Sequence, residues 1–126
     1  MCLYLIPMKR KILVVEDDAD IREIIAHILT DEGFEPILCK NEKNIFDVIR
    51  AHNPDVILLD VIKPTHQGTE LCRSIKAAET TKHIPVIVLS THAKIDDVKE
   101  VCADEVVKKP FDISLLVDVV KQQLAA

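Results

Sequence analysis

Short apolar runs recur along the chain, and each is followed by a stretch in which apolar residues stand three or four positions apart. The runs are rich in β-branched residues, which is typical of strands buried inside a sheet. The spacing of the intervening stretches is typical of helices that bury one face. Five runs predict strands, at 12–15, 36–39, 56–59, 86–89 and 106–107.

Five amphipathic stretches predict a helix after each of these strands. We expect Asp18 to cap the first helix and Gly33 to end it in the left-handed conformation. We expect Asn41 to open the second helix and Pro54 to end it. The apolar positions that mark the helices are Ile21, Ile24, Ile25, Ile28 and Leu29; Ile45, Val48 and Ile49; Leu71, Ile75 and Ala78; Val98 and Val101; and Ile113, Leu116, Val117, Val120 and Leu124.

Alternating strands and helices predict a parallel sheet that is covered by helices on both faces. The 126 residues suit one compact domain. We expect that domain to be formed by residues 9–126, because no linker or low-complexity segment divides them. Residues 1–8 are expected to be a disordered or non-native extension, since Met8 and the basic residues after it resemble a second start.

Composition narrows the classes of function. The formal net charge of -5 argues against the phosphate backbone of a nucleic acid as the main partner, so no direct nucleic-acid binding is expected. The four cysteines are scattered and form no C-x-x-C pair, which favours free thiols in a reducing cytoplasm. No apolar run has the length of a bilayer span, so no membrane insertion is expected. With only two glycines, the chain has no glycine-rich phosphate loop.

Polar residues stand directly after four of the five predicted strands, where an open parallel sheet binds its ligands. They are Glu16 and Asp17, Asp60, Ser90, and Lys109. Each type has an ordinary alternative role, as a helix cap, a turn former or a solvated cation. Their joint placement at four strand ends favours a site.

Acids from two strands would repel each other at one rim of the sheet. A hard divalent cation bound through oxygens removes that cost, and Mg²⁺ suits a site with few protein carboxylates. A carboxylate such as Asp60 can act as a nucleophile toward phosphorus. A metal ion and a lysine such as Lys109 can neutralise the incoming phosphoryl oxygens.

Five segments carry a recognisable pattern: ILVVEDDADIR at 12–22, PDVILLD at 54–60, the loop from Pro64 to Gly68, IPVIVLS at 84–90 and KPF at 109–111. Together they resemble the response-regulator receiver family of two-component signalling, over about residues 9–124. The resemblance implies an α/β, flavodoxin-like doubly wound fold, with a single five-stranded parallel sheet in the strand order 2-1-3-4-5.

The resemblance also implies a role for each candidate residue. Asp60 is expected to be the phosphoacceptor and a ligand of Mg²⁺. Asp17 is expected to bind the metal directly, Glu16 mainly through water, and Ile62 through its backbone carbonyl. The hydroxyl of Ser90 and the ammonium of Lys109 are expected to bind the phosphoryl group, with the bond between Lys109 and Pro110 in the cis form.

Three features depart from the family pattern. Val106 stands where the family usually has Tyr or Phe, and Cys102-Ala103-Asp104 stands for the usual Gly-Ala-Asp. Lys109 follows Ser90 by 19 positions, about one helical turn fewer than is usual, so we expect a short fourth helix. These departures affect the surface of helix 4, strand 5 and helix 5 through which relatives signal.

Two positions beside the site bear on how long a phosphoryl group lasts. Ile62 and His92 lie two places beyond Asp60 and Ser90. An apolar Ile62 hinders water, whereas His92 can orient a water molecule for attack. A moderately long-lived phosphoryl group is the hypothesis that follows.

The expected function is that of a phosphoacceptor domain rather than an enzyme, catalysing only its own phosphotransfer and slow autodephosphorylation. Its donor would be a phosphohistidine on a histidine kinase or phosphotransfer protein, and its output would act on a downstream protein in trans. One alternative is a pseudo-receiver that binds partners without phosphorylation, which Val106 favours. Another is an Asp-nucleophile phosphatase, but that class expects a second Asp two places after the nucleophile, where Ile62 stands.

Overall fold

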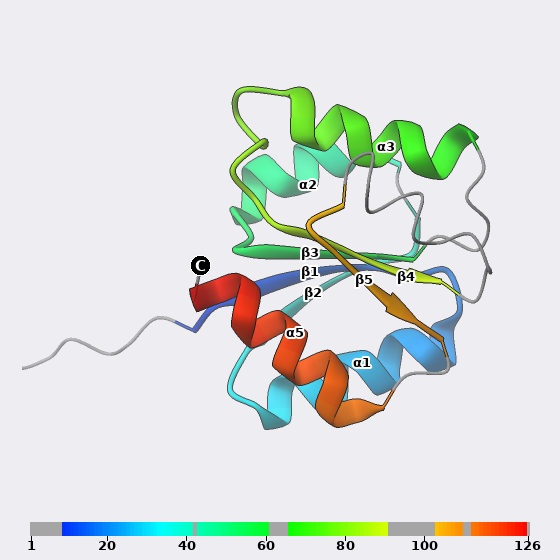
Figure 1. Ribbon diagram of the computed structural model, residues 1–126, viewed down its shortest axis with the longest axis vertical. Helices are drawn as coiled ribbons and strands as arrows, with labels where there is room; N and C mark the ends of the chain where they lie inside the picture. Colours follow the sequence, from blue (N-terminus) through cyan, green and yellow to red (C-terminus); the bar gives the residue numbers. More distant parts are fainter. Residues whose placement is uncertain (1–8, 42, 61–65, 91–102, 110–111, 126) are drawn as a thin grey trace, which may run out of the picture.

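Five parallel strands form one sheet in the computed structural model, which describes residues 9–41, 43–60, 66–90, 103–109 and 112–125 (Figure 1). The order β2-β1-β3-β4-β5 is the order predicted from the sequence. Every predicted apolar run lies inside an observed strand. The strands are β1 (Lys11–Val15), β2 (Glu35–Cys39), β3 (Val56–Asp60), β4 (Val86–Ser90) and β5 (Glu105–Lys108).

Helices cover both faces of the sheet, with α2 and α3 on one face and α1 and α5 on the other (Figure 1). The predicted helix around Val98 and Val101 lies outside the described residues. Of the helices that the structure describes, none combines the length and apolarity that a bilayer span requires. The helices are α1 (Ala19–Asp31), α2 (Ile45–His52), α3 (His66–Ala77) and α5 (Ile113–Ala125).

The apolar runs of the central strands β1, β3 and β4 are continuous because these strands are buried on both faces. In β1, Leu13 and Val15 pack in the layer with Ile45 and Ile49 of α2, whereas Ile12 and Val14 pack in the opposite layer. Side chains point alternately to the two faces of a strand, so a two-sided core requires apolar residues at every position.

The first helix begins and ends where the sequence predicts. The Asp18 carboxylate accepts hydrogen bonds from the backbone N–H groups of Asp20 at 2.9 Å and Ile21 at 3.1 Å. These bonds satisfy two amides that the helix leaves without an internal partner. Beyond the helix, Gly33 adopts φ +87°, the left-handed conformation that glycine reaches without a steric penalty.

The predicted start of the second helix is wrong. Helix α2 begins at Ile45, and Asn44 precedes it in the left-handed conformation. Asn41 instead accepts a hydrogen bond from the backbone N–H of Lys43 at 2.9 Å. An asparagine side chain that folds back on a nearby amide favours a turn over a helix, so the chain turns once more before α2.

The register of the strands brings the candidate residues to one edge of the sheet. Val15 pairs with Leu59, so Glu16 follows β1 at the level of Asp60 in β3. Asp60 pairs with Leu89, and Ser90 pairs with Lys108. Because all the strands are parallel, their carboxyl ends meet at this edge, as the sequence predicts.

Candidate functional site

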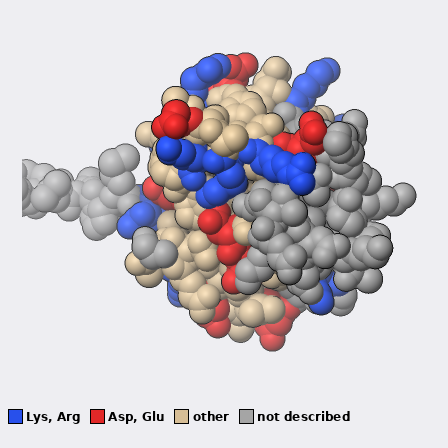
Figure 2. Space-filling model, turned by 45° about the horizontal axis from the view of Figure 1, so that its top comes forward, with Lys and Arg blue, Asp and Glu red and all other residues tan. Residues whose placement is uncertain are grey.

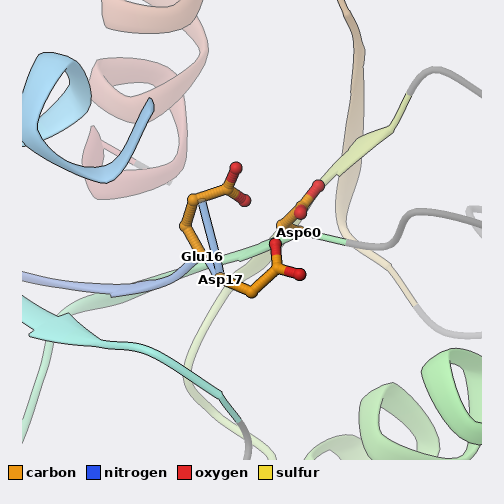
Figure 3. A group of neighbouring side chains, drawn as sticks. All are labelled: Glu16, Asp17 and Asp60. Carbon is orange, nitrogen blue, oxygen red and sulfur yellow. The ribbon is translucent and has the colours of Figure 1, made fainter. Parts of the chain in front are cut away.

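Three carboxylates converge at the carboxyl edge of the sheet. Glu16 and Asp17 follow β1, Asp60 ends β3, and one oxygen from each lies within 4.8 Å of the others (Figure 3). Glu16 is only 1% exposed and the Asp60 side chain only 7%, whereas Asp17 is exposed. The site is therefore a shallow acidic group that opens to solvent at Asp17.

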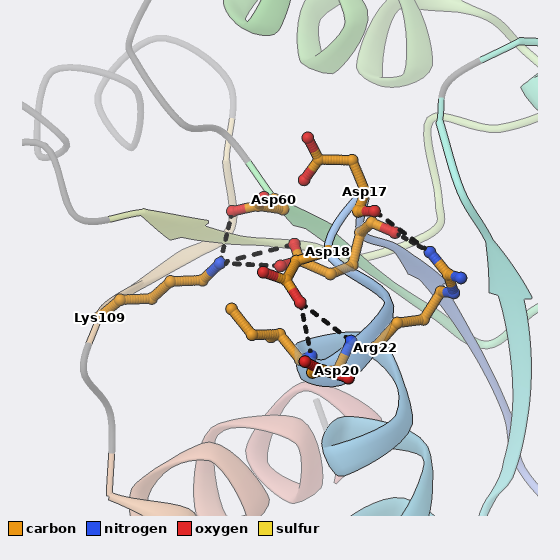
Figure 4. A network of polar contacts seen from close by, with 8 residues as sticks. Asp17, Asp18, Asp20, Arg22, Asp60 and Lys109 are labelled. Carbon is orange, nitrogen blue, oxygen red and sulfur yellow. Dashed lines mark hydrogen bonds and ion pairs between the residues drawn. The ribbon is translucent and has the colours of Figure 1, made fainter.

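The cation that meets this group is Lys109, which comes from the segment after β5. Its Nζ lies 2.8 Å from Oδ1 of Asp60, and 3.2 and 3.5 Å from the two carboxylate oxygens of Glu16 (Figure 4). The Lys109 side chain is only 13% exposed. Residues separated by 49 and 93 positions in the sequence thus form one ionic cluster.

This environment changes the proton affinities of both buried partners. Burial, then the hydrogen bond and negative charge of Asp60, raise the pKa of Glu16 from 4.5 to about 8, against the opposing effect of Lys109. Burial alone would lower the pKa of Lys109. Its contacts with Asp60 and Glu16 outweigh that effect and hold its pKa above the ordinary 10.5.

The donor set fits a hard divalent cation. All three groups offer carboxylate oxygens, and Lys109 supplies one positive charge against three acids. Oxygen ligands with an excess of negative charge are what Mg²⁺ and Ca²⁺ prefer in proteins. Burial is the largest cause of the raised pKa of Glu16, and the neighbouring charge of Asp60 adds to it; a positive metal ion would oppose both effects.

The structure brings some of the remaining candidates to this edge and leaves others undescribed. Ser90 is the last residue of β4, so its backbone lies at the same edge, but the position of its hydroxyl is not among the described features. Ile62, His92 and Pro110 lie outside the described residues. Their roles as a carbonyl ligand, a modulator and a cis proline stay predictions.

Val106 lies within β5, and the residues just before β5 make contacts away from the carboxylates. Val106 is half-buried and packs against the core layer of α2 and α3. Ahead of β5, Ala103 is buried, and the Asp104 carboxylate accepts hydrogen bonds from Val86 N–H and Lys76 Nζ, both at 2.8 Å. These contacts join α3, β4 and β5 at the edge of the sheet opposite the carboxylates.

Charges of both signs cover the face that Figure 2 shows. Lys and Arg side chains form a band there, with Asp and Glu side chains close to it. Ion pairs join the two signs in several described places, such as Lys82 with Glu79 at 2.9 Å. The face in Figure 2 thus carries charges of both signs.

Two features of the site were not predicted from the sequence. Arg22 donates from its guanidinium to the carbonyl of Glu16 at 2.8 Å. In the sequence, Arg22 stands out only as the last residue of the segment ILVVEDDADIR.

A shallow groove of about 830 Å³ lies between α1 and the start of α5. Ile24 and Ile113 line the groove and are each 56% exposed, which their helical spacing alone did not indicate.

Comparisons with known proteins agree with this architecture. The phosphate regulon transcriptional regulatory protein PhoB of Escherichia coli (strain K12) is 35% identical over 117 residues, covering 90% of this chain and 51% of that protein. A crystal structure of a putative response regulator from Chloroflexus aurantiacus superimposes with a TM-score of 0.84 at 27% identity, covering 94% of this chain and all of that one. The signal receiver domain of a histidine kinase from Syntrophus aciditrophicus gives 0.82 at 30% identity, covering 92% and 90%.

The matches cover nearly all of this chain but only part of the curated relatives. The chain spans about half the length of the curated relatives that it matches, so the match concerns one of their domains. The family model for the response regulator receiver domain matches residues 12–121. Together with the sheet order and the acidic edge, this shows that the chain belongs to the response regulator receiver domain family of two-component systems.

Proposed function

We propose that this receiver domain is a phosphoacceptor in which Asp60 takes a phosphoryl group from a phosphohistidine. The observation that carries the proposal is the setting of the Asp60 carboxylate. One of its oxygens meets the ammonium of Lys109 at 2.8 Å, and it lies within 4.8 Å of two further acids. A nucleophilic carboxylate with a cation beside it and a metal-binding set around it suits phosphoryl transfer.

Mg²⁺ is the metal we assign to the acidic group. Asp17 and Asp60 would hold it directly, Glu16 mainly through water, and the Ile62 carbonyl would complete the protein ligands. The ion would supply positive charge that offsets the acids and the oxygens of the entering phosphoryl group. The exposure of Asp17 supports this assignment, because Mg²⁺ keeps several water ligands and needs access to solvent.

The chemistry we propose is an in-line displacement at phosphorus. A carboxylate oxygen of Asp60 forms the new O–P bond, and the N–P bond of the phosphohistidine breaks. The electron pair of the broken bond goes to the imidazole nitrogen, which takes a proton from solvent. Lys109 then pairs with the phosphoryl oxygens, and the Ser90 hydroxyl would donate to one of them.

The groove between α1 and α5 is where we place the protein that donates the phosphoryl group. Helix α1 starts just after the acidic segment, and α5 starts four residues beyond Lys109, so the groove adjoins the site. Exposed Ile24 and Ile113 offer an apolar surface, and the acidic residues Asp20 and Glu23 also line the groove. A histidine kinase or phosphotransfer protein that docks here, in the cytoplasm, would bring its phosphohistidine to Asp60.

The output would follow from the change in charge at Asp60. A phosphoryl group draws Lys109 and Ser90 toward it, and shifts the domain toward a conformation with a different affinity for a downstream protein in trans. The surface near strand β5 and α5 would carry this conformational change. Val106, which stands where the family usually has Tyr or Phe, would alter how the change is transmitted. Ile62 and His92 would set how slowly the phosphoryl group is lost.

Beryllofluoride binding tests the proposal, because beryllofluoride mimics an acyl phosphate on a carboxylate. Binding to the full chain in the presence of Mg²⁺ is followed by backbone amide resonances in NMR spectra. We expect saturable changes around Asp60 in the wild-type protein and none in Asp60→Asn. A wild-type protein whose spectrum is unchanged by beryllofluoride and Mg²⁺ would instead support the pseudo-receiver alternative.

A further inference from the structure

The segment that carries Glu16 and Asp17 is held by one backbone contact and by the side chains of Asp18 and Arg22. The backbone N–H of Glu16 donates to the carbonyl of Cys39 in β2 at 3.0 Å. The Asp18 carboxylate caps α1. From the first turn of α1, Nη1 of Arg22 reaches back to the carbonyl of Glu16 at 2.8 Å and lies 3.5 Å from the carbonyl of Asp17.

The position of the Asp17 carboxylate depends on this backbone. Asp17 is exposed, and over the described residues no hydrogen bond or ion pair engages its carboxylate. The peptide units on either side of Asp17 therefore set the point from which its carboxylate reaches toward the site. A charged donor that reaches two successive carbonyls restrains the peptide unit between them, because hydrogen bonds from an ionised group are stronger than those from a neutral one.

Arg22 also adds a second positive charge to the acidic segment. Lys109 approaches the segment on the carboxylate side, and Arg22 approaches it on the opposite side (Figure 4). Two of the three carboxylates, those of Glu16 and Asp60, thus have one cation in direct contact, and a second cation acts on the segment through the carbonyls. This second charge lowers the cost of holding Glu16 and Asp17 close together without occupying an oxygen that a metal ion would use.

We infer that Arg22 is a positioning residue, which binds the carbonyls of Glu16 and Asp17 and so holds their carboxylates in the arrangement that binds a divalent cation. This role rests on the proposed function, because it assigns Arg22 to the same metal-binding group. Arg22 itself binds neither the metal nor the phosphoryl group. Groups that orient metal ligands from behind contribute strongly to metal affinity in other proteins.

The test compares Mg²⁺ affinity in the full chain and in three variants by isothermal titration calorimetry. Arg22→Gln removes the charge and shortens the side chain, and we expect it to weaken Mg²⁺ binding by about tenfold. Arg22→Lys keeps the charge and one donor direction, so part of the loss should be recovered. Arg50→Gln is the matched control, since Arg50 bonds to Asp47 within α2 and both side chains are exposed, and this variant should bind Mg²⁺ as the wild type does.

A merely structural role for Arg22 would give a different pattern. It would lower the melting temperature of the metal-free protein but leave the Mg²⁺ affinity of the folded protein unchanged. The inference is overturned if folded Arg22→Gln, or Arg22→Lys where the first variant does not fold, binds Mg²⁺ as tightly as the wild type. If the wild type itself binds no Mg²⁺, the proposed function fails first, and the role of Arg22 fails with it.

Discussion

The ammonium of Lys109 lies 2.8 Å from Oδ1 of Asp60, at a position where both side chains are almost fully buried. The same ammonium meets Glu16 at 3.2 Å. Lys109 therefore serves two acids before any phosphoryl group arrives. It balances their charge in the resting domain, and in the proposed mechanism it transfers this attraction to the phosphoryl oxygens.

Removing that cation should destabilise the resting domain. Lys109→Met leaves two buried acids without their partner, and we expect a loss of about 3 kcal/mol in unfolding free energy, measured by urea denaturation without metal. The loss lies at the low end for a buried pair because Glu16 can take up a proton. Added Mg²⁺ should restore more stability to the variant than to the wild type.

Lys121→Met is the matched control for that experiment. Lys121 pairs with Glu32 at 3.1 Å, but the Lys121 side chain is 55% exposed. An exposed pair of this kind contributes less than about 1 kcal/mol. Equal losses in the two variants would contradict the view that the Lys109 cluster is a distinct, buried one.

The stability of the metal-free protein should fall as the pH rises through the range set by Glu16. Its pKa is raised from 4.5 to about 8, so between these values the folded domain keeps a proton that the unfolded chain has released. Unfolding free energy therefore decreases with pH across this range. Urea denaturation of the wild type and Glu16→Gln, compared across the range, isolates this contribution, because Gln cannot titrate. Parallel pH profiles for the two proteins would refute the assignment.

A substitution in the groove between α1 and α5 should slow phosphotransfer from a protein donor but not phosphorylation by a small molecule. Ile24→Asp places a charge in the apolar part of the groove, where Ile24 is 56% exposed. We expect phosphotransfer from a phosphorylated histidine kinase to slow by about tenfold or more, since central apolar residues dominate interface energies. Phosphorylation by phosphoramidate should be unchanged.

Leu38→Asp controls for the general effect of a new surface charge. Leu38 is 44% exposed on the edge strand β2 and does not line the groove. It should leave both reactions unaltered. Slower reaction with phosphoramidate in Ile24→Asp would mean that the substitution disturbs the site itself rather than docking.

Asp104 should contribute to stability although it lies far from the chemistry. Its carboxylate accepts from Val86 N–H and Lys76 Nζ, and Asp104→Ala leaves both donors without this partner. We expect a loss of about 2 kcal/mol in unfolding free energy, because an amide deprived of its acceptor costs more than the bond contributes. Asp118→Ala, an exposed acid on α5, should change stability little. A similar effect of both substitutions on the denaturation midpoint would argue against the Asp104 contacts.

Much of the fold follows from local patterns. Strands such as 56–59 were predictable because burial on both faces demands an unbroken apolar run, and parallel pairing then brings their last residues to one edge. Asp60 could be placed beside Glu16 for the same reason. The cap at Asp18 was predictable because a carboxylate before a helix has few better partners than the free amides.

Other features depend on packing that no local pattern encodes. Asn41 and Asn44 are both suitable residues to precede a helix, and the burial of Ile45 and Ile49 decides in favour of the later start. The contact of Arg22 depends on one rotamer among many of a long side chain. The groove between α1 and α5 joins residues some 90 positions apart, so it exists only once the sheet has brought these helices together.

The central claim is that Asp60 accepts a phosphoryl group, and intact-protein mass spectrometry tests it most directly. The full chain is incubated with phosphoramidate and Mg²⁺, and the site of modification is mapped on proteolytic peptides. We predict a gain of one phosphoryl group on the peptide that contains Asp60, no gain in Asp60→Asn, and no gain when the metal is chelated. An unmodified wild-type protein, or a phosphoryl group that persists in Asp60→Asn, would contradict the account.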